Sequence, residues 1–267
     1  MLPSIDIAQV TLEARRLCEE LAQACEDASL AAGAEGGAPD APQMADLCDA
    51  LHRALVALDA QGSKLPRHVA IPGQPPQAQS AAGLDDPGAP DLGALADHGI
   101  DLLAHLSALA GRLRLPQHAR QIEALALPLA CWAARRGAEL GRPAPVVNAA
   151  AGLANGLKTP ADLATLYGLM SEVVDAMSPK ITQDRDPTDA TRPWRILLLN
   201  RAIVATRSHR RDLMEAAFDA IVDDLPGDAP DFFREAMAQM DALDYPRQVR
   251  AVVERYAETW STPRILH

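Results

Sequence analysis

Prolines stand at regular intervals in the second half of this chain, each at the opening of an apolar, helix-forming stretch. Pro145 and Pro160 are fifteen residues apart, and Pro230 and Pro246 are sixteen apart. Proline suits the first position of an α-helix and disrupts the interior, because its φ is fixed and it has no N–H. The spacing therefore predicts successive pairs of helices, each about three to four turns long.

The residues between these prolines favour helices over strands. About fifty of the 267 residues are alanine, while aromatic residues make up only 3%. Alanine and leucine are among the strongest helix formers, and alternating runs of β-branched and aromatic residues, which indicate strands, are absent. We expect an all-α protein, consisting of a helical hairpin and an α-solenoid-like domain of helix-turn-helix pairs.

Apolar residues that recur at three- and four-residue steps locate the individual helices. Pro128 is expected to bend or divide the fourth of them. Ser208 is a candidate cap for a helix starting at His209, and Thr159–Asp162 reads as a capped helix start. The expected spans are 6–29, 42–60 (with Asp40 as its cap), 92–113, 116–139, 145–157, 160–177, 193–207, 209–224, 230–242 and 246–260.

A segment rich in proline, glycine and glutamine divides the chain at residues 62–91. Such a composition cannot form a packed face, so we expect a flexible linker. It separates an acidic helical hairpin at 1–61 from a helical repeat-like domain at 92–267. The alternative is a proline-rich ligand for SH3-like domains.

The helix pairs repeat after thirty-seven residues between Pro193 and Pro230. In this they resemble tetratricopeptide (TPR-like) solenoids, whose period is near 34 residues. If Pro226 ends a repeat, Phe218 takes the aromatic position of the second helix, whereas Met214 departs from the small residue expected four positions earlier. The resemblance concerns architecture, and it implies no functional residue.

Charge and composition exclude several classes of function. The net charge is −11, which is poorly suited to phosphate neutralisation and makes nucleic acid a disfavoured partner. No run of eighteen apolar residues and no signal sequence is present, so we expect a cytoplasmic protein with no membrane partner. No glycine-rich phosphate loop and no GxSxG or HExxH motif occurs, and we expect no cofactor and no catalytic residue.

The strongest functional signal is a basic island at residues 179–211, where eight basic residues face three acidic ones. Arginine binds carboxylate or phosphate with two parallel hydrogen bonds. The island therefore predicts a binding site for a protein partner with an acidic segment, or for the acidic hairpin of this chain. The alternative is that its arginines pair with nearby acidic residues and helix ends. The candidate residues are Arg192, Arg195, Arg201, Arg207, His209, Arg210 and Arg211.

A rival hypothesis places an enzyme or ligand site between the helices at 92–113 and 116–139, or under the segment 178–192. His98, Asp101 and His105 share one helix face, and His118 lies on the next helix, so the four are a weak alternative metal site. A solvated polar face is the simpler interpretation. Other polar residues that such a pocket could use are Glu123 and Asp175.

Two further alternatives involve the N-terminal helices. Cys18 and Cys25 share a helix face and Cys48 lies on the next helix. A redox or metal role requires all three to come together, and buried cysteines acting as small apolar residues are commoner. The leucine stripe of residues 44–58 offers a surface for a homo-oligomer. The leading hypothesis remains a non-catalytic interaction or adaptor module that binds a partner through its helical-repeat surface and its arginine-rich patch.

Overall fold

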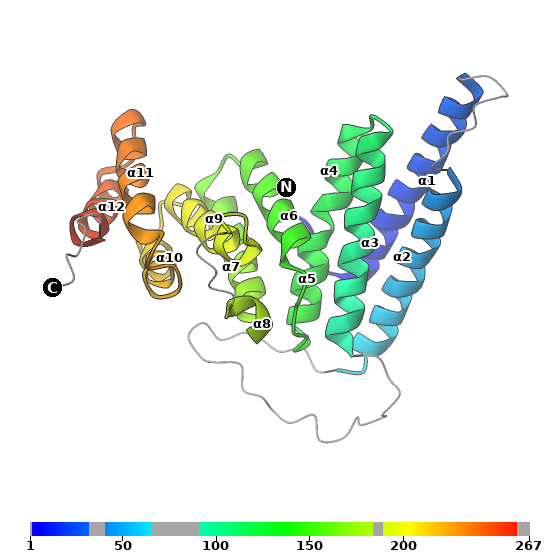
Figure 1. Cartoon of the computed structure of the whole chain (residues 1–267), viewed down its shortest axis with the longest axis horizontal. Helices are drawn as coiled ribbons and strands as arrows, with labels where there is room; N and C mark the ends of the chain where they lie inside the picture. Colours follow the sequence, from blue (N-terminus) through cyan, green and yellow to red (C-terminus); the bar gives the residue numbers. More distant parts are fainter. Residues whose placement is uncertain (1, 32–40, 66–90, 184–188, 261–267) are drawn as a thin grey trace. The chain divides into compact units, whose positions relative to one another are not determined.

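The structure, a computed structural model, describes residues 2–31, 41–65, 91–183 and 189–260. These residues form helices and no strands, so the predicted all-α class is confirmed (Figure 1). None of the helices in these ranges is long and apolar enough to cross a membrane. The expected linker falls largely at 66–90, and the expected cap Asp40 is also outside the described residues.

The helices form two compact units. The domain boundaries at 1–61, 62–91 and 92–267 stay a prediction. The N-terminal unit contains residues 3–153 and 175–181, and the C-terminal unit contains most of the rest, from residues 154–174 and 182 onward. The chain passes between the units within α6, at the last residue of α7 and within α8, and the hairpin shares a unit with the three helices that follow it.

The helices of the N-terminal unit pack around an aliphatic core. Helix α1 runs antiparallel to α2, α2 packs on α3, and α3 packs on α4 and α5 (Figure 1). Leucines on the inner faces of α1, α2 and α3 are almost fully buried, including Leu21, Leu58 and Leu106. The elements are α1 (Ile7–Ala31), α2 (Ala41–Gly62), α3 (Leu92–Arg112), α4 (Pro116–Ala124), α5 (Ala126–Ala134) and α6 (Pro143–Gly156).

Gly62, the last residue of α2, packs closely against Trp132 of α5. A Cβ atom on Gly62 would lie 2.2 Å from the ring of Trp132, so only glycine permits this close approach. Arg136 contacts both residues. Its guanidinium lies 3.8 Å from the Trp132 ring centre, and its Nε donates a hydrogen bond to the Gly62 carbonyl at 3.1 Å. The α1–α2 hairpin is thereby anchored to the rest of its unit.

The fourth expected helix is divided, as predicted, but not at Pro128 itself. Helix α4 ends at Ala124 and α5 begins at Ala126, which places Pro128 in the first turn of α5. There the missing N–H is tolerated, because the first helical N–H groups have no partner within their own helix. The residue after α5 that turns the chain is Gly137, with φ of 78°.

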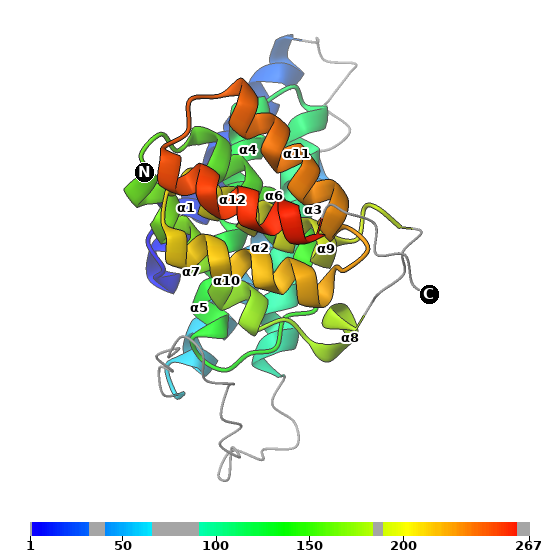
Figure 2. The same cartoon turned by 90° about the vertical axis from the view of Figure 1, so that its left-hand side faces the viewer.

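In the C-terminal unit the helices pair in sequence order. Helix α9 packs on α10, α11 packs on α12, and α12 also contacts α10 (Figure 2). The repeat period of a tetratricopeptide solenoid stays a prediction. The elements are α7 (Pro160–Asp175), α9 (Pro193–Arg207), α10 (Arg211–Asp224), α11 (Ala229–Ala242) and α12 (Arg247–Trp260), with the short α8 (Pro179–Thr182) at the division between the units.

Prolines open these helices as the sequence predicted. Pro160 and Pro193 are the first residues of α7 and α9, Pro230 is the second residue of α11, and Pro246 directly precedes α12. The predicted cap of α7 is also confirmed, since the Asp162 N–H donates to the Thr159 hydroxyl at 3.1 Å. Proline position therefore marks helix starts in this unit.

The predicted start of α10 at His209, capped by Ser208, is wrong. The Ser208 hydroxyl donates back to the Ala205 carbonyl at 2.6 Å and so closes the end of α9. His209 has φ of 57°, the left-handed conformation that commonly follows a helix end. Helix α10 begins only at Arg211.

Candidate functional site

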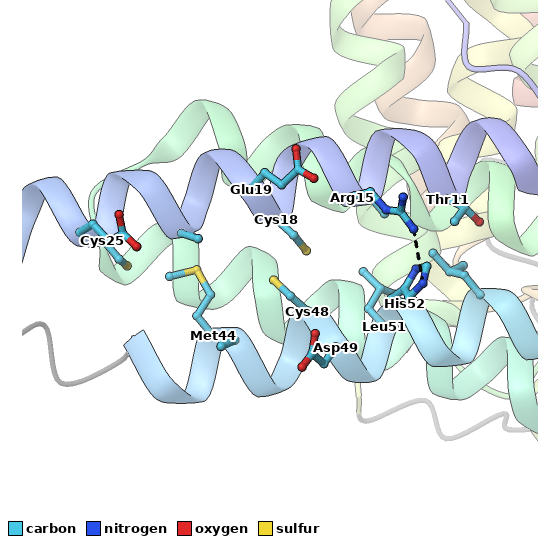
Figure 3. A pocket seen from close by; sticks show the side chains of 15 residues that line it. Thr11, Arg15, Cys18, Glu19, Cys25, Met44, Cys48, Asp49, Leu51 and His52 are labelled. Atoms are coloured by element: carbon cyan, nitrogen blue, oxygen red, sulfur yellow. Dashed lines mark hydrogen bonds between the residues drawn. The ribbon is translucent and has the colours of Figure 1, made fainter.

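A groove of about 870 Å³ lies between α1 and α2 in the N-terminal unit (Figure 3). Its walls come from positions three and four residues apart on each helix, such as Ala14, Cys18 and Ala22 on α1 and Ala45 and Cys48 on α2. Such positions share one helix face. Because these side chains are small, the two helices pack on the core side while their outer faces leave an open hollow.

Sulfur-bearing side chains occupy the middle of this groove. Cys18 and Cys48 point toward one another from α1 and α2, and Cys25 and Met44 line the groove further along (Figure 3). Cys18 and Cys48 are half-buried, and their thiols are close enough for each to shift the pKa of the other. The structure therefore brings together two of the three cysteines, and Cys25 lies further along the groove.

The two thiols shift one another's pKa because they lie close together. The pKa of Cys18 is raised by the neighbouring Cys48 thiol, by burial and by the nearby carboxylates of Asp49 and Glu19. The pKa of Cys48 is lowered by the neighbouring Cys18 thiol, against the opposing effects of burial and Asp49. Cys48 is thus the thiol of the pair that ionises more readily.

Charged side chains give the groove two different ends. Arg15 and His52 lie at one end, where an Arg15 guanidinium nitrogen is 3.4 Å from His52 Nε2 (Figure 3). Three carboxylates, Glu19, Glu26 and Asp49, line the groove and its other end. Acidic residues also outnumber arginines on both helices. The groove therefore offers an apolar floor with a predominantly acidic rim.

Two large apolar side chains remain exposed on the same hairpin. Leu12 on α1 has 61% of its surface exposed and Val56 on α2 has 50%. Val56 follows His52 by four residues and Leu12 precedes Arg15 by three, so each shares a helix face with a residue of the groove. Exposed apolar residues grouped beside a groove are typical of an interaction surface.

The arginines of the predicted basic island are largely engaged within their own unit. Arg207 donates to the carbonyls of Ala154 and Leu157 at 2.9 and 3.1 Å. Arg195 bonds to Asp228 at 2.7 Å. Both contacts join segments far apart in the sequence, so these side chains stabilise the fold.

Arg192 and Arg201 are buried rather than displayed on a surface. Arg192 donates from Nε to the Asp189 carbonyl at 3.1 Å. Arg201 lies over the Tyr167 ring at 5.5 Å, bonds weakly to Ser171 at 3.4 Å, and has no partner for its Nε among the described residues. The exposed surface that they offer to a ligand is small.

The remaining members of the basic island lie at the start of α10. Arg210 pairs with Asp212 and Arg211 with Glu215, and both guanidinium groups are more than half exposed. His209 packs edge-on against the Tyr245 ring, with 5.9 Å between ring centres. Partner binding by the seven residues stays a prediction, and Arg210 and Arg211 are the members of the group that a partner could reach.

The four residues of the alternative metal site do not converge. Asp101 pairs with Arg142 at 2.8 Å, and His118 Nε2 lies 3.3 Å from a Glu20 carboxylate oxygen. His98 and His105 are exposed on α3. Within the described ranges, no group of three or more histidine, cysteine or acidic side chains is arranged to hold a metal ion.

A second, smaller hollow of about 420 Å³ lies elsewhere in the N-terminal unit. It is lined by Gln117, Arg120 and Glu123 of α4 and by Gly152 and Leu153 of α6. The rival hypothesis placed a pocket between the helices at 92–113 and 116–139. Glu123 does line a hollow, but the opposite wall is α6.

The leucine stripe at 44–58, considered as a subunit interface, is mostly buried inside the unit. Met44, Leu51, Leu55 and Leu58 have at most 2% of their surface exposed. Met44, Leu51 and Leu55 also line the α1–α2 groove, so this part of the stripe forms the buried floor of the groove. On its other side α2 packs on α3.

The cysteine positions in the sequence indicate this groove, but helical periodicity alone does not show which cysteines face one another. Cys18, Cys25 and Cys48 were recognised as members of neighbouring helices, but the register between α1 and α2 decides which of them meet. Pairing Cys18 with Cys48 also aligns Arg15 with His52, as observed. A search for small residues at facing positions of the two helices would have indicated the hollow.

Comparison with known proteins gives no further guide. No family model, no curated protein and no solved structure that was searched matches the chain.

Proposed function

We propose that this protein is an interaction module that binds an amphipathic helix of a partner protein in the α1–α2 groove. The observation that carries the proposal is the groove itself, about 870 Å³ in volume, open along two antiparallel helices and flanked by the exposed Leu12 and Val56. A helix in a groove is a common mode of peptide recognition, in which apolar residues at i, i+3, i+4 and i+7 supply the anchors.

The chemistry of the groove specifies the partner more closely. Its floor is formed by small and apolar side chains, whereas Glu19, Glu26 and Asp49 supply negative charge along it. Complementary charges across an interface speed association and select the partner. The helix that fits has an apolar stripe flanked by lysine or arginine.

The test uses the intact protein and a fluorescent synthetic helix with an apolar stripe flanked by lysines. Ala22→Trp and Ala45→Trp fill the groove from its exposed rim, so they should weaken binding by about tenfold or more without disturbing the core. Ala108→Trp, at an exposed position of α3 outside the groove, is the matched control. Fluorescence anisotropy gives the dissociation constant of each variant, and circular dichroism checks that each is folded.

Two outcomes would overturn this assignment. The first is absence of binding, or binding that Ala108→Trp weakens as much as the groove variants do. The second is selective binding of an acidic peptide that is lost on Arg210→Glu and Arg211→Glu. The latter result would move the partner site to the start of α10, where the two guanidinium groups are exposed.

A further inference from the structure

Cys18 and Cys48 are positioned to react with one another and with small molecules, unlike cysteines that only fill space in a core. Their sulfur atoms face one another across the groove, and both residues remain partly accessible (Figure 3). Cys131, by contrast, has no exposed surface, and Cys25 retains only 3%. A small molecule that enters the groove therefore meets the Cys18–Cys48 pair before either of the other thiols.

The surroundings assign different roles to the two thiols. Cys48 ionises more readily than Cys18, because the neighbouring Cys18 thiol lowers the pKa of Cys48 while the pKa of Cys18 is raised. The thiolate is the nucleophile in thiol–disulfide exchange. Cys18, held in contact with Cys48, is then positioned to attack any mixed disulfide that forms there.

We propose that Cys18 and Cys48 form a redox-active dithiol that exchanges with low-molecular-weight disulfides to give a disulfide bond between α1 and α2. In the first step, the Cys48 thiolate attacks one sulfur of the small disulfide and forms a mixed disulfide, and one small thiolate leaves and takes up a proton from water. In the second step, Cys18 loses its proton to water, its sulfur attacks Cys48 Sγ, and the second small thiolate leaves. Two electrons pass from the cysteine pair to the small disulfide, which becomes two thiols.

The local packing allows both steps. Side chains of neighbouring helices that point toward one another can approach the Cα separation of about 4.4–6.8 Å that a disulfide requires. Ala14, Ala22 and Ala45 leave space in the groove for the incoming molecule. Glu19 and Asp49 lie beside the thiols, so a cationic disulfide should be favoured over an anionic one.

The experiment treats the reduced, full-length protein with cystamine, a cationic disulfide, and in parallel with the anionic oxidised glutathione. After remaining thiols are alkylated, intact mass should show the loss of two hydrogen atoms. Peptide mapping should join the Cys18 and Cys48 peptides, at a rate independent of protein concentration. Cystamine should react at least about tenfold faster than oxidised glutathione at low ionic strength, and dithiothreitol should restore the dithiol.

Single substitutions separate the two roles. Cys18→Ser should stop at a mixed disulfide on Cys48, and Cys48→Ser should react more slowly because it lacks the thiol that ionises more readily. Cys25→Ala, a groove cysteine outside the pair, should still form the Cys18–Cys48 bond. The proposal is overturned if peptide mapping of the unaltered protein never joins Cys18 to Cys48. Mapping of the unaltered protein decides the matter even where a variant fails to fold.

Discussion

The two units are built from helices of similar kind but are stabilised in different ways. The N-terminal unit has an aliphatic core of leucine and alanine, to which Trp132 adds a single large ring. The C-terminal unit contains every phenylalanine and every tyrosine of the chain. There Phe218 lies edge-on to Phe232, Phe233 and Tyr256, with 5.1–5.9 Å between ring centres.

The two units also differ in what their charged side chains contact. In the C-terminal unit arginines pair with carboxylates or with backbone carbonyls, such as Arg195 with Asp228 and Arg207 with Ala154. Along the α1–α2 groove of the N-terminal unit, carboxylates line an apolar hollow instead. Several arginines of the basic island contact groups of their own unit, whereas the alanine-rich hairpin has an open groove.

The largest expected effect is on the aromatic core of the C-terminal unit. Phe218→Ala should lower the free energy of unfolding by about 3–5 kcal/mol, because it removes a fully buried ring and leaves a cavity. Leu103→Ala, in the aliphatic core of the N-terminal unit, is the comparison and should cost about 2–5 kcal/mol. Urea unfolding of both variants measures the difference. A loss well below about 3 kcal/mol for Phe218→Ala would contradict a tightly packed aromatic core.

The next effect tests whether Arg207 supports the fold. Arg207→Met removes both donors to the Ala154 and Leu157 carbonyls and should cost about 1.5–3 kcal/mol. Arg211→Met removes an exposed ion pair with Glu215 and should cost less than about 1 kcal/mol. Urea unfolding under identical conditions ranks them. Equal losses would mean that the two arginines are not distinguished by their partners.

A glycine substitution tests the anchoring of the α1–α2 hairpin in the N-terminal unit. Gly62→Ala places a methyl group against Trp132 and should cost about 1–3 kcal/mol through overpacking. Gly111→Ala, in α3, meets no atom within 4 Å and should stabilise the protein by about 0.5–1 kcal/mol. Thermal unfolding should therefore move in opposite directions for the two variants. A shift in the same direction would show that the Trp132 contact is not tight.

The smallest effect concerns the acid stability of the C-terminal unit. Arg255 and Arg211 lower the pKa of Glu215 below its usual value of 4.5. A carboxyl group with a lowered folded pKa contributes stability that is fully present above the unfolded pKa and is lost as the pH falls through the folded pKa. In Glu215→Gln the free energy of unfolding should therefore fall less steeply as the pH drops below about 4.5. Urea unfolding across the acid range tests this, and an unchanged pH profile would contradict it.

The helices themselves were predictable because their signals are local. Pro160 and Pro193 mark helix starts through their own backbone chemistry, and the Thr159–Asp162 cap forms within a single turn. The wrong prediction that Ser208 caps α10 also concerns only a few neighbouring residues. A serine can cap either the helix that follows or the one that precedes it, and the left-handed φ of His209 selects the preceding helix.

The sequence by itself determined an all-helical protein, because alanine, leucine and proline act on the backbone within a few residues of where they stand. Only the tertiary structure decided which side chains meet. It paired Arg207 with carbonyls fifty and more residues earlier, and it aligned Cys18 with Cys48 across two helices. Such contacts depend on the register and packing of whole helices, and a linear pattern carries no direct record of either.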